Sequence, residues 1–385
     1  MRQHQRERVG STLRRWRVRR GLSQRSAAQQ VVEAGGGLSH STLARIEQGR
    51  LEPGWQELLH LARVYEVPED WLLHVLSVEP PVLGPTQDLR ALLDRGVEHW
   101  RRGEIPEALG CAVAVRETQP RTAEERRLRQ RATIEFATYA RGMGWLKFAR
   151  SLLDEVLCEP LEPAFQVRAL VLGAAVWSAL GSSIVARAFV DYAARLTSAE
   201  ANPREAAMVL HQKAKVLTEL GQFDEAQDAI EEALKLYAKT GEEFNAARAT
   251  LLLGRILEDR GDAAGGLEAR RRALAVSREK GFKNVEMHAL LEIGRQLTTL
   301  NRAEDAIRAL QEALALAVTQ QDANVEFHAE QRLSKAYGAI GNAAAAEAAL
   351  EAARNLAGRI DDGSRHVTEL RPAREGKQAE EWQAE

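Results

Sequence analysis

Apolar residues recur at helical spacing through most of the chain, and this spacing predicts an all-α protein. Near the N-terminus, Val9, Leu13 and Trp16 stand at i, i+4 and i+7, which predicts an amphipathic helix over residues 6–20. The segments SQRSAAQQVV and HSTLARIEQ carry shorter apolar stripes of the same kind. Alanine and leucine are abundant while aromatic residues make up only 5%, so the composition also favours helix over sheet.

The two short helices are joined by a glycine-rich turn. Ser23 is a good N-cap for the first helix, and Ser39 is a good N-cap for the second. Gly49 stands at the C-cap position that ends the second helix. Further helices are predicted in WQELLHLARVY and, beginning at Pro68, in EDWLLHVL. Two short helices joined by a turn, the second polar on its outer side, predict a helix-turn-helix.

This region also carries a family resemblance. The residues concerned are Ser23-Gln24, Ala27-Ala28, Leu38-Ser39, Thr42-Leu43, Arg45-Ile46-Glu47 and Gln48-Gly49-Arg50. Over roughly residues 6–78 the chain resembles the Cro-type, or xenobiotic-response-element (XRE), helix-turn-helix family. The resemblance implies a DNA-binding domain of five short helices and a structural ion pair between Arg17 and Glu47. The chain departs from the family in a longer turn, by about the five residues Glu33 to Gly37.

The same resemblance implies which residues contact DNA. They lie at the start of the first helix, on the second helix and in the loop after it: Gln24, Arg25, Ser39, His40, Ser41, Thr42, Arg45, Gln48 and Arg50. The physics agrees, because a helix fits the major groove of B-DNA and an arginine can bond a guanine at two points. The alternative is that Arg45 is an ordinary solvated arginine and Ser41 a helix filler.

The rest of the chain repeats itself. Glycines recur on a 40-residue grid, with an asparagine in the same register: Gly181, Gly221, Gly261, Asn301 and Gly341. A small residue follows each of these turns five residues later, and another precedes the last four by seven residues. Self-similarity at a fixed period indicates a solenoid of helix pairs, and the small residues let the helices cross closely. The pattern resembles tetratricopeptide repeats and implies a right-handed α-solenoid of about seven units.

These patterns divide the chain into four segments. We predict a helix-turn-helix domain over 1–78, a proline-rich linker over 79–88, the repeat solenoid over 89–358 and a disordered polar tail over 359–385. The charge is uneven: residues 1–50 contain eleven Arg and three Glu, a net charge of +8, whereas the whole chain carries −2. A basic head on an acidic body is expected when only the head binds a polyanion.

The repeat register places four cations at one equivalent position, six residues before each turn. They are Lys215, Arg255, Arg295 and Lys335, and His288 and His328 share a register one heptad earlier. In tetratricopeptide proteins this position faces the concave surface, so the resemblance implies a ligand groove lined by these six residues. Glu219 and Asp259 stand four residues after the first two cations and can neutralise them. The last two cations have no such neighbour, so we expect an acidic peptide, a C-terminal carboxylate or another anion there. The alternative is a solvated basic stripe.

No pattern typical of an enzyme, a metal site or a cofactor site occurs in the sequence. The nine histidines are scattered, and the only two cysteines, Cys111 and Cys158, lack metal spacing and suit a reducing cytosol. The chain has no run of eighteen apolar residues, so no membrane is expected as a partner. These observations predict a cytoplasmic protein that is not an enzyme and needs no cofactor.

The order of the two domains resembles the peptide-responsive quorum-sensing regulators of the RRNPP family. The resemblance implies a transcription regulator that binds double-stranded DNA as a homodimer, with a repeat domain that senses a peptide or other anionic ligand. The peptide ligand rests on architecture alone. A different reading is a protein–protein interaction scaffold, in which the repeats recruit a partner protein to DNA. A third, a hydrolase within the solenoid, lacks a catalytic constellation.

Overall fold

The computed structural model of the chain describes residues 3–65, 81 and 88–357. All regular structure in these residues is helical, which confirms the all-α prediction. None of the described helices is long and apolar enough to cross a membrane. The described residues form two compact units, one of residues 3–65, 81, 88–100, 104–140 and 147–176, the other of 101–103, 141–146 and 177–357.

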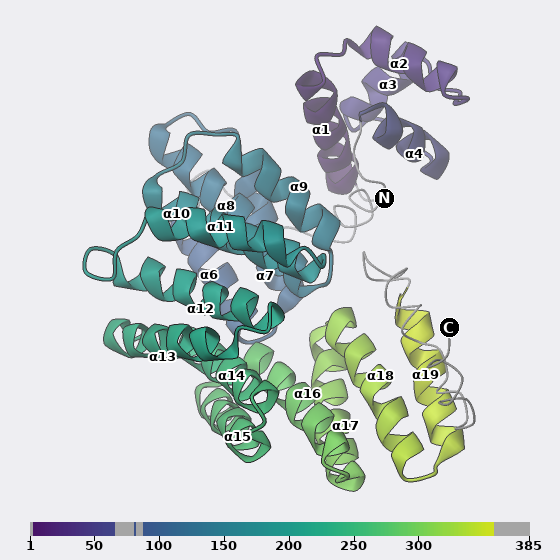
Figure 1. The fold of residues 1–385 in the computed structure, drawn as a ribbon. Helices are drawn as coiled ribbons and strands as arrows, with labels where there is room; N and C mark the ends of the chain where they lie inside the picture. The colour runs from purple at the N-terminus through teal and green to yellow at the C-terminus, as the bar shows by residue number, and fades with distance from the viewer. Residues whose placement is uncertain (1–2, 66–80, 82–87, 358–385) are drawn as a thin grey trace, which may run out of the picture. The chain divides into compact units, whose positions relative to one another are not determined.

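Four helices form the described part of the helix-turn-helix domain. They are α1 (Gln3–Arg19), α2 (Gln24–Glu33), α3 (His40–Glu47) and α4 (Trp55–Val64) (Figure 1). Both predicted N-caps are confirmed, because the Oγ of Ser23 accepts a hydrogen bond from the amide of Ser26 and the Oγ of Ser39 accepts one from the amide of Thr42. The predicted fifth helix, which begins at Pro68, lies outside the described residues.

Two glycines let α1 lie directly against α3. A Cβ atom added to Gly10 would stand 2.2 Å from the carbonyl oxygen of Ile46. At the end of α3, Gly49 has a left-handed φ of 68°, and an added Cβ would stand 2.6 Å from the Cα of Glu7. Glycine is therefore required at Gly10 by the close approach of two backbones, and at Gly49 by this approach and by the left-handed turn that ends α3.

The long turn between α2 and α3 is packed against the domain. The amide of Gly36 donates a hydrogen bond to the carbonyl oxygen of Val31 at 2.8 Å. An added Cβ at Gly36 would stand 2.7 Å from the Cγ1 of Val31. Leu38 is 1% exposed and contributes to the core just before α3 begins. The additional residues therefore form a compact turn that delivers a buried leucine ahead of the second helix.

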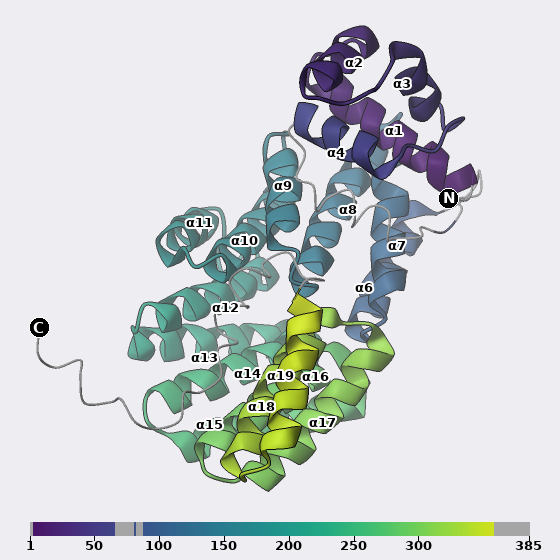
Figure 2. The same ribbon diagram turned by 90° about the vertical axis from the view of Figure 1, so that its right-hand side faces the viewer.

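The remaining helices follow one another along the sequence, two to a repeat. In residues 88–357 they are α6 (Leu89–Arg101) and α7 (Ile105–Arg116), α8 (Ala123–Gly142) and α9 (Leu146–Leu157), α10 (Pro163–Ala179) and α11 (Ser183–Arg195), α12 (Pro203–Glu219) and α13 (Phe223–Thr240), α14 (Glu243–Asp259) and α15 (Ala263–Lys280), α16 (Lys283–Thr299) and α17 (Ala303–Gln320), α18 (Ala323–Ala339) and α19 (Ala343–Ala357). Figures 1 and 2 show the pairs from α12 to α19 following one another in a stack. This arrangement confirms the predicted repeat solenoid.

The turns within the pairs fall where the 40-residue grid places them. Gly181, Gly221, Gly261 and Gly341 all have left-handed φ values, between 74° and 95°. Asn301, which replaces glycine on the grid, has a φ of 56°. Asparagine tolerates this conformation better than most residues, because its short polar side chain can bond locally. Turns between consecutive pairs follow the same rule at Gly241, Gly281 and Gln321, a second grid that sequence reasoning overlooked.

The small residues lie where helices cross. Gly254 in α14 faces Gly266 in α15, and a Cβ on Gly266 would stand 2.6 Å from the carbonyl oxygen of Gly254. The equivalent residues Ala226 and Ala306 are completely buried. Apolar side chains from both helices of each pair, such as Leu310, fill the space around these crossings. The predicted linker, apart from Pro81 and Asp88, and the predicted tail lie outside the described residues.

Candidate functional site

Helix α3 presents a polar side to solvent. His40 and Arg45 on this helix are exposed, and so are Gln48 and Arg50 after it and Arg25 on α2. Within the part of the chain that the structure describes, the side chains of these five residues have no hydrogen-bond or ion-pair partner. Their donors and acceptors are therefore available to a ligand outside the domain.

The other side of α3 is tied to α1 and α2 by a buried polar network. The Nε of Arg17 donates to Oε1 of Glu47 at 2.6 Å, and its Nη2 donates to Oε2 at 2.9 Å. The ion pair that the family resemblance implied is thus confirmed. The Nε2 of Gln24 also donates to Glu47, at 2.7 Å. An amide nitrogen has two hydrogens, so one N–H of Gln24 is left for the predicted contact with a phosphate.

Three hydroxyl groups gather at the start of α3. The Oγ of Ser39 accepts from the amide of Thr42 at 3.1 Å and lies 2.7 Å from its Oγ1. The Oγ of Ser41 lies 3.0 Å from the Oγ of Ser39. These hydroxyls bond one another as part of the N-cap, whereas His40 and Arg45 are the two long polar side chains of the exposed face without such a bond. The pair His40 and Arg45 therefore has the longer reach toward base edges.

The four equivalent cations on the repeat helices differ in their surroundings. Arg255 is exposed, and its Nε lies 3.5 Å from Oδ2 of Asp259, the partner that the sequence predicted. Lys335 is exposed. His328, half-buried, packs its ring against that of Phe327 with the centroids 5.1 Å apart. Arg255 and Lys335 are therefore the two exposed residues of the predicted groove, and its other four residues are half-buried.

Arg295 has carboxylate partners, which corrects the expectation that it has none. Its Nη2 donates to Oε2 of Glu258 at 2.5 Å, and its Nε donates to Oε2 of Glu292 at 3.0 Å. Glu258 also accepts from the fully buried Arg270, and Glu292 also accepts from Arg332. Spacing within one helix pointed only to position 299, four residues later, which is a threonine. The structure supplies one from the preceding repeat and one three residues earlier.

This network neutralises the middle of the predicted cation series. Burial alone would raise the pKa of Glu292, but the guanidinium groups of Arg332 and Arg295 outweigh it and lower this pKa to about 2. Glu292 therefore stays ionised at neutral pH. Alternating charges run from Arg270 on α15 through α14 and α16 to Arg332 on α18, and they join successive repeats.

Lys215 lacks the partner that the sequence predicted for it. Glu219 instead accepts hydrogen bonds from the hydroxyls of Ser178, at 2.5 Å, and Ser183, at 3.1 Å. Lys215 is half-buried, and no described residue forms a hydrogen bond or ion pair with it. Burial, and the positive charge of Arg141, lower the pKa of Lys215 to about 8. Glu219 therefore acts on Lys215 through its charge, which opposes the lowering of this pKa, and not through a direct ion pair.

Sequence reasoning missed a second cation of this kind, Arg248 on α14. It is half-buried, without a partner among the described residues, and burial lowers the pKa of its guanidinium. Its register is that of His288 and His328, 40 and 80 residues later, so the repeat pattern could have revealed it. Burial and the charge of Arg248 lower the pKa of His288 to about 4, so this histidine is neutral at pH 7.

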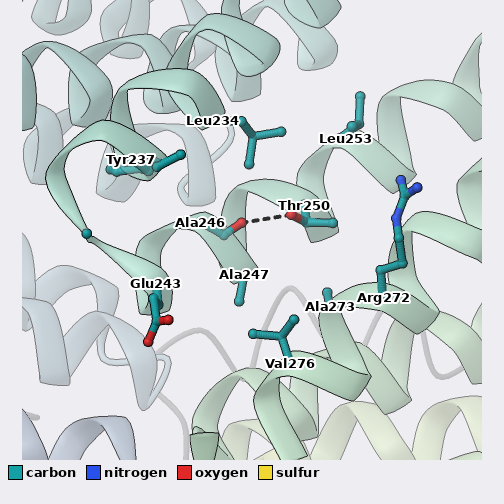
Figure 3. Close-up of a pocket in the computed structure, with 12 residues that line it drawn as sticks. Leu234, Tyr237, Glu243, Ala246, Ala247, Thr250, Leu253, Arg272, Ala273 and Val276 are labelled. Carbon is teal, nitrogen blue, oxygen red and sulfur yellow. Dashed lines mark hydrogen bonds between the residues drawn. The ribbon is translucent and has the colours of Figure 1, made fainter. Parts of the chain in front are cut away.

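A pocket elsewhere on the repeats contains none of the predicted residues. Its volume is about 560 Å³, and it lies between α13, α14 and α15. Figure 3 shows the largely apolar lining, with Leu234 and Tyr237 from α13, Leu253 from α14 and Val276 from α15. The polar side chains of its lining are Glu243, Thr250 and Arg272, and the hydroxyl of Thr250 already donates to the carbonyl oxygen of Ala246. Because the partnerless half-buried cations lie elsewhere, we look for the candidate ligand site on the first helices of the repeats.

Comparisons with known proteins agree with this architecture. A family model described as a helix-turn-helix domain matches residues 8–75, and a tetratricopeptide repeat model matches residues 209–240. No curated protein sequence matches the chain. The chain therefore carries an N-terminal helix-turn-helix domain followed by tetratricopeptide repeats.

Two solved structures share the fold over most of their length. A Rap protein complexed with competence and sporulation factor is 15% identical, with a TM-score of 0.57, and the match covers 74% of this chain and 81% of that one. NprR in complex with its cognate peptide NprX is 10% identical, with a TM-score of 0.53, covering 75% and 84%. Bacillus thuringiensis PlcR in complex with the peptide PapR7 and DNA matches at 14% identity with a TM-score of 0.46, covering 74% and 99%.

Proposed function

We propose that this protein is a sequence-specific DNA-binding transcriptional regulator whose repeat domain senses a peptide or another anionic ligand. One observation carries the DNA-binding part. His40 and Arg45 stand exposed on α3 without a partner among the described residues, while the buried pair of Arg17 and Glu47 fixes the opposite side of that helix to α1. A rigid helix with free donors on its outer face is the form in which side chains read the major groove.

The charge distribution supports the same proposal. The first 50 residues carry a net charge of +8, and the remaining residues bring the total to −2. Phosphate neutralisation supplies much of the affinity of a protein for DNA, so the basic head is the part expected to bind. The guanidinium groups of Arg25 and Arg50 are exposed and have no partner among the residues that the structure describes, as phosphate contacts need.

Ligand sensing is supported by the shared fold. The solved structure of the Rap protein contains competence and sporulation factor, and that of NprR contains its cognate peptide NprX. In this chain, the first helices of the repeats carry uncompensated cations, which suit an anionic group of a ligand. A small rotation of each repeat adds up along a solenoid, so ligand binding can be transmitted to the helix-turn-helix domain.

A homodimer is part of the proposal. One recognition helix contacts few base pairs, and helix-turn-helix proteins gain specificity by reading two half-sites about 34 Å apart. Two copies of this chain are then expected on one palindromic operator. Sedimentation of the protein with a selected DNA duplex measures the number of protein copies bound to each duplex.

The test is a DNA titration after selection of a binding sequence from a random duplex pool. Arg45→Ala should weaken binding to the selected sequence by about 1–3 kcal/mol and relax the preference at one base pair. Arg50→Ala should weaken binding to all sequences alike. Arg271→Ala, which removes one exposed charge from α15, is the control and should leave binding unchanged.

Two results would contradict the proposal. If no duplex is enriched over the starting pool, the helix-turn-helix does not read DNA, and a protein-recruiting role for the repeats becomes the better explanation. If a duplex is enriched but Arg45→Ala binds it as the unmodified protein does, α3 is not the recognition helix.

A further inference from the structure

We propose that Lys215 and Arg248 form a carboxylate-binding site on the first helices of two neighbouring repeats, α12 and α14. The inference rests on the proposed ligand-sensing function and specifies the chemistry of the ligand, a peptide that presents a carboxylate. The carboxylate comes either from an acidic side chain or from the C-terminus of the peptide, and the experiment below distinguishes the two.

The site is a cluster on adjoining helices. His211 and Lys215 are one turn apart on α12 and therefore share a face of that helix. Helix α14, which carries Arg248, packs against α12. The charges of Arg248 and Lys215 both act on His211, whose ring lies edge-on to Tyr237 with the centroids 6.2 Å apart. These contacts bring two cations and an imidazole together on the first-helix face.

Neither cation forms an ion pair with a described residue, although the surrounding repeats are rich in carboxylates. Glu219, the nearest candidate in the sequence, is held by two serine hydroxyls. From α15 to α18, by contrast, Arg270, Arg295 and Arg332 all have glutamate partners. The absence of partners for Lys215 and Arg248 among the described residues is therefore local to this cluster.

The uncompensated charges raise the free energy of the empty site. Burial lowers the pKa of Lys215 to about 8 and also lowers the pKa of Arg248. Arg141, at the end of α8 and in the same compact unit, adds a third positive charge, and burial lowers its pKa to about 10. A bound anion would relieve this repulsion, because an opposite charge stabilises the ionised form of each cation.

A carboxylate matches the donors that the cluster offers. A guanidinium can donate two parallel hydrogen bonds to the two oxygens of a carboxylate, and an ammonium can donate a further one. Burial and the nearby cations lower the pKa of His211 to about 3, so its neutral ring adds a hydrogen-bond donor without adding charge. A neutral peptide segment would leave both cations unpaired.

The test is affinity selection followed by mass spectrometry, with two synthetic pools of random acetylated heptapeptides. One pool ends in free carboxylates and the other in amides. A C-terminal carboxylate ligand is retained only from the acid pool, whereas a side-chain carboxylate enriches Asp or Glu at one position in both. Retention should fall about tenfold to a hundredfold in Lys215→Met/Arg248→Met, since charge-assisted hydrogen bonds are lost.

The control is Lys239→Met/Arg271→Met, which removes the same charges from exposed positions on the second helices α13 and α15. It should retain the same peptides as the unmodified protein. If the retained peptides show no preference for a carboxylate, or if Lys215→Met/Arg248→Met retains acidic peptides equally well, the carboxylate site is wrong while peptide sensing stands. If no peptide is retained, peptide sensing fails and the inference fails with it. The DNA titration of Arg45→Ala is independent of either outcome.

A second readout separates a binding role for Lys215 from a purely structural one. The charged groups that act on this amine are Arg141, Arg248 and Arg255, with Glu219 opposing them. Near pH 8 about half of the Lys215 side chains are protonated, and a bound carboxylate should complete the protonation. Calorimetry of a retained peptide in buffers of different ionisation heat should therefore show uptake of about half a proton at pH 8 and almost none at pH 6. Equal uptake by Lys215→Met would contradict the assignment.

Discussion

Arg17 and Glu47 form a two-point ion pair between α1 and α3, with nitrogen–oxygen distances of 2.6 and 2.9 Å. Both residues are buried, at 8% and 6% exposure, and the Nη1 of Arg17 also donates to the carbonyl oxygen of Leu22 at 2.7 Å. The pair therefore fixes the recognition helix from behind. Arg17 is also the cation that compensates the buried negative charge of the Glu47 carboxylate.

We expect Arg17→Met to destabilise the helix-turn-helix domain by about 3–5 kcal/mol, because it leaves the Glu47 carboxylate buried without its partner. Urea unfolding measures the change when it is followed by the fluorescence of Trp16 in a background in which the other six tryptophans are replaced by phenylalanine. Arg14→Met, an exposed position on the same helix, is the control. In Arg17→Met/Glu47→Leu most of the loss should be recovered, and a double variant as unstable as the single one would show that packing rather than charge is lost.

Gly10 predicts an unusual response to alanine. Alanine normally stabilises a helix by about 1 kcal/mol relative to glycine. At this position an added Cβ would stand 2.2 Å from the carbonyl oxygen of Ile46, so α1 must move away from α3. We expect Gly10→Ala to destabilise the domain by about 1–3 kcal/mol and to weaken DNA binding. Thermal melting of the two proteins measures the change in stability. Gly37→Ala is the control and should leave the melting temperature unchanged, because an added Cβ at Gly37 would have no atom within 4 Å.

The alternating charges along the repeats predict that Glu258 matters for stability. Its carboxylate accepts from Arg270, whose side chain is completely buried, and from Arg295. Glu258→Gln removes the negative charge beside that buried cation, and we expect a loss of about 3–5 kcal/mol. Urea unfolding followed by circular dichroism measures it. The exposed Glu268→Gln should unfold as the unmodified protein does.

Glu292 predicts how the stability of the repeats depends on pH. Its pKa in the folded protein is about 2, below the value of about 4.3 for an unfolded chain. A lowered pKa stabilises the fold above the unfolded value, and this contribution is lost as the pH falls through the folded value. We expect Glu292→Gln to cost about 2 kcal/mol at pH 6 and progressively less between pH 4 and 2. A difference from the unmodified protein that stays constant over this range would contradict the ionisation argument.

The sequence determined the fold class, because the signals involved are local. A capping serine, a glycine at a left-handed turn or an apolar stripe influences only residues a few positions away in the sequence. The 40-residue grid added the order of the helix pairs, including the close crossing of Gly254 and Gly266. For the helix-turn-helix, the resemblance to a known family supplied the Arg17–Glu47 pair, which joins residues 30 positions apart.

Only the tertiary structure decided which cations are free. Equivalent positions in the repeats carry Lys215 and Arg295, and local spacing predicted a partner for the first and none for the second. The structure shows the reverse, because Glu258 reaches Arg295 from the preceding repeat and two serines hold Glu219. Whether a charge is paired depends on every helix that packs against it. Glu258 stands 37 residues before Arg295 in the sequence, and Glu219 stands 41 residues after Ser178. Spacing along one helix contains no information about those contacts.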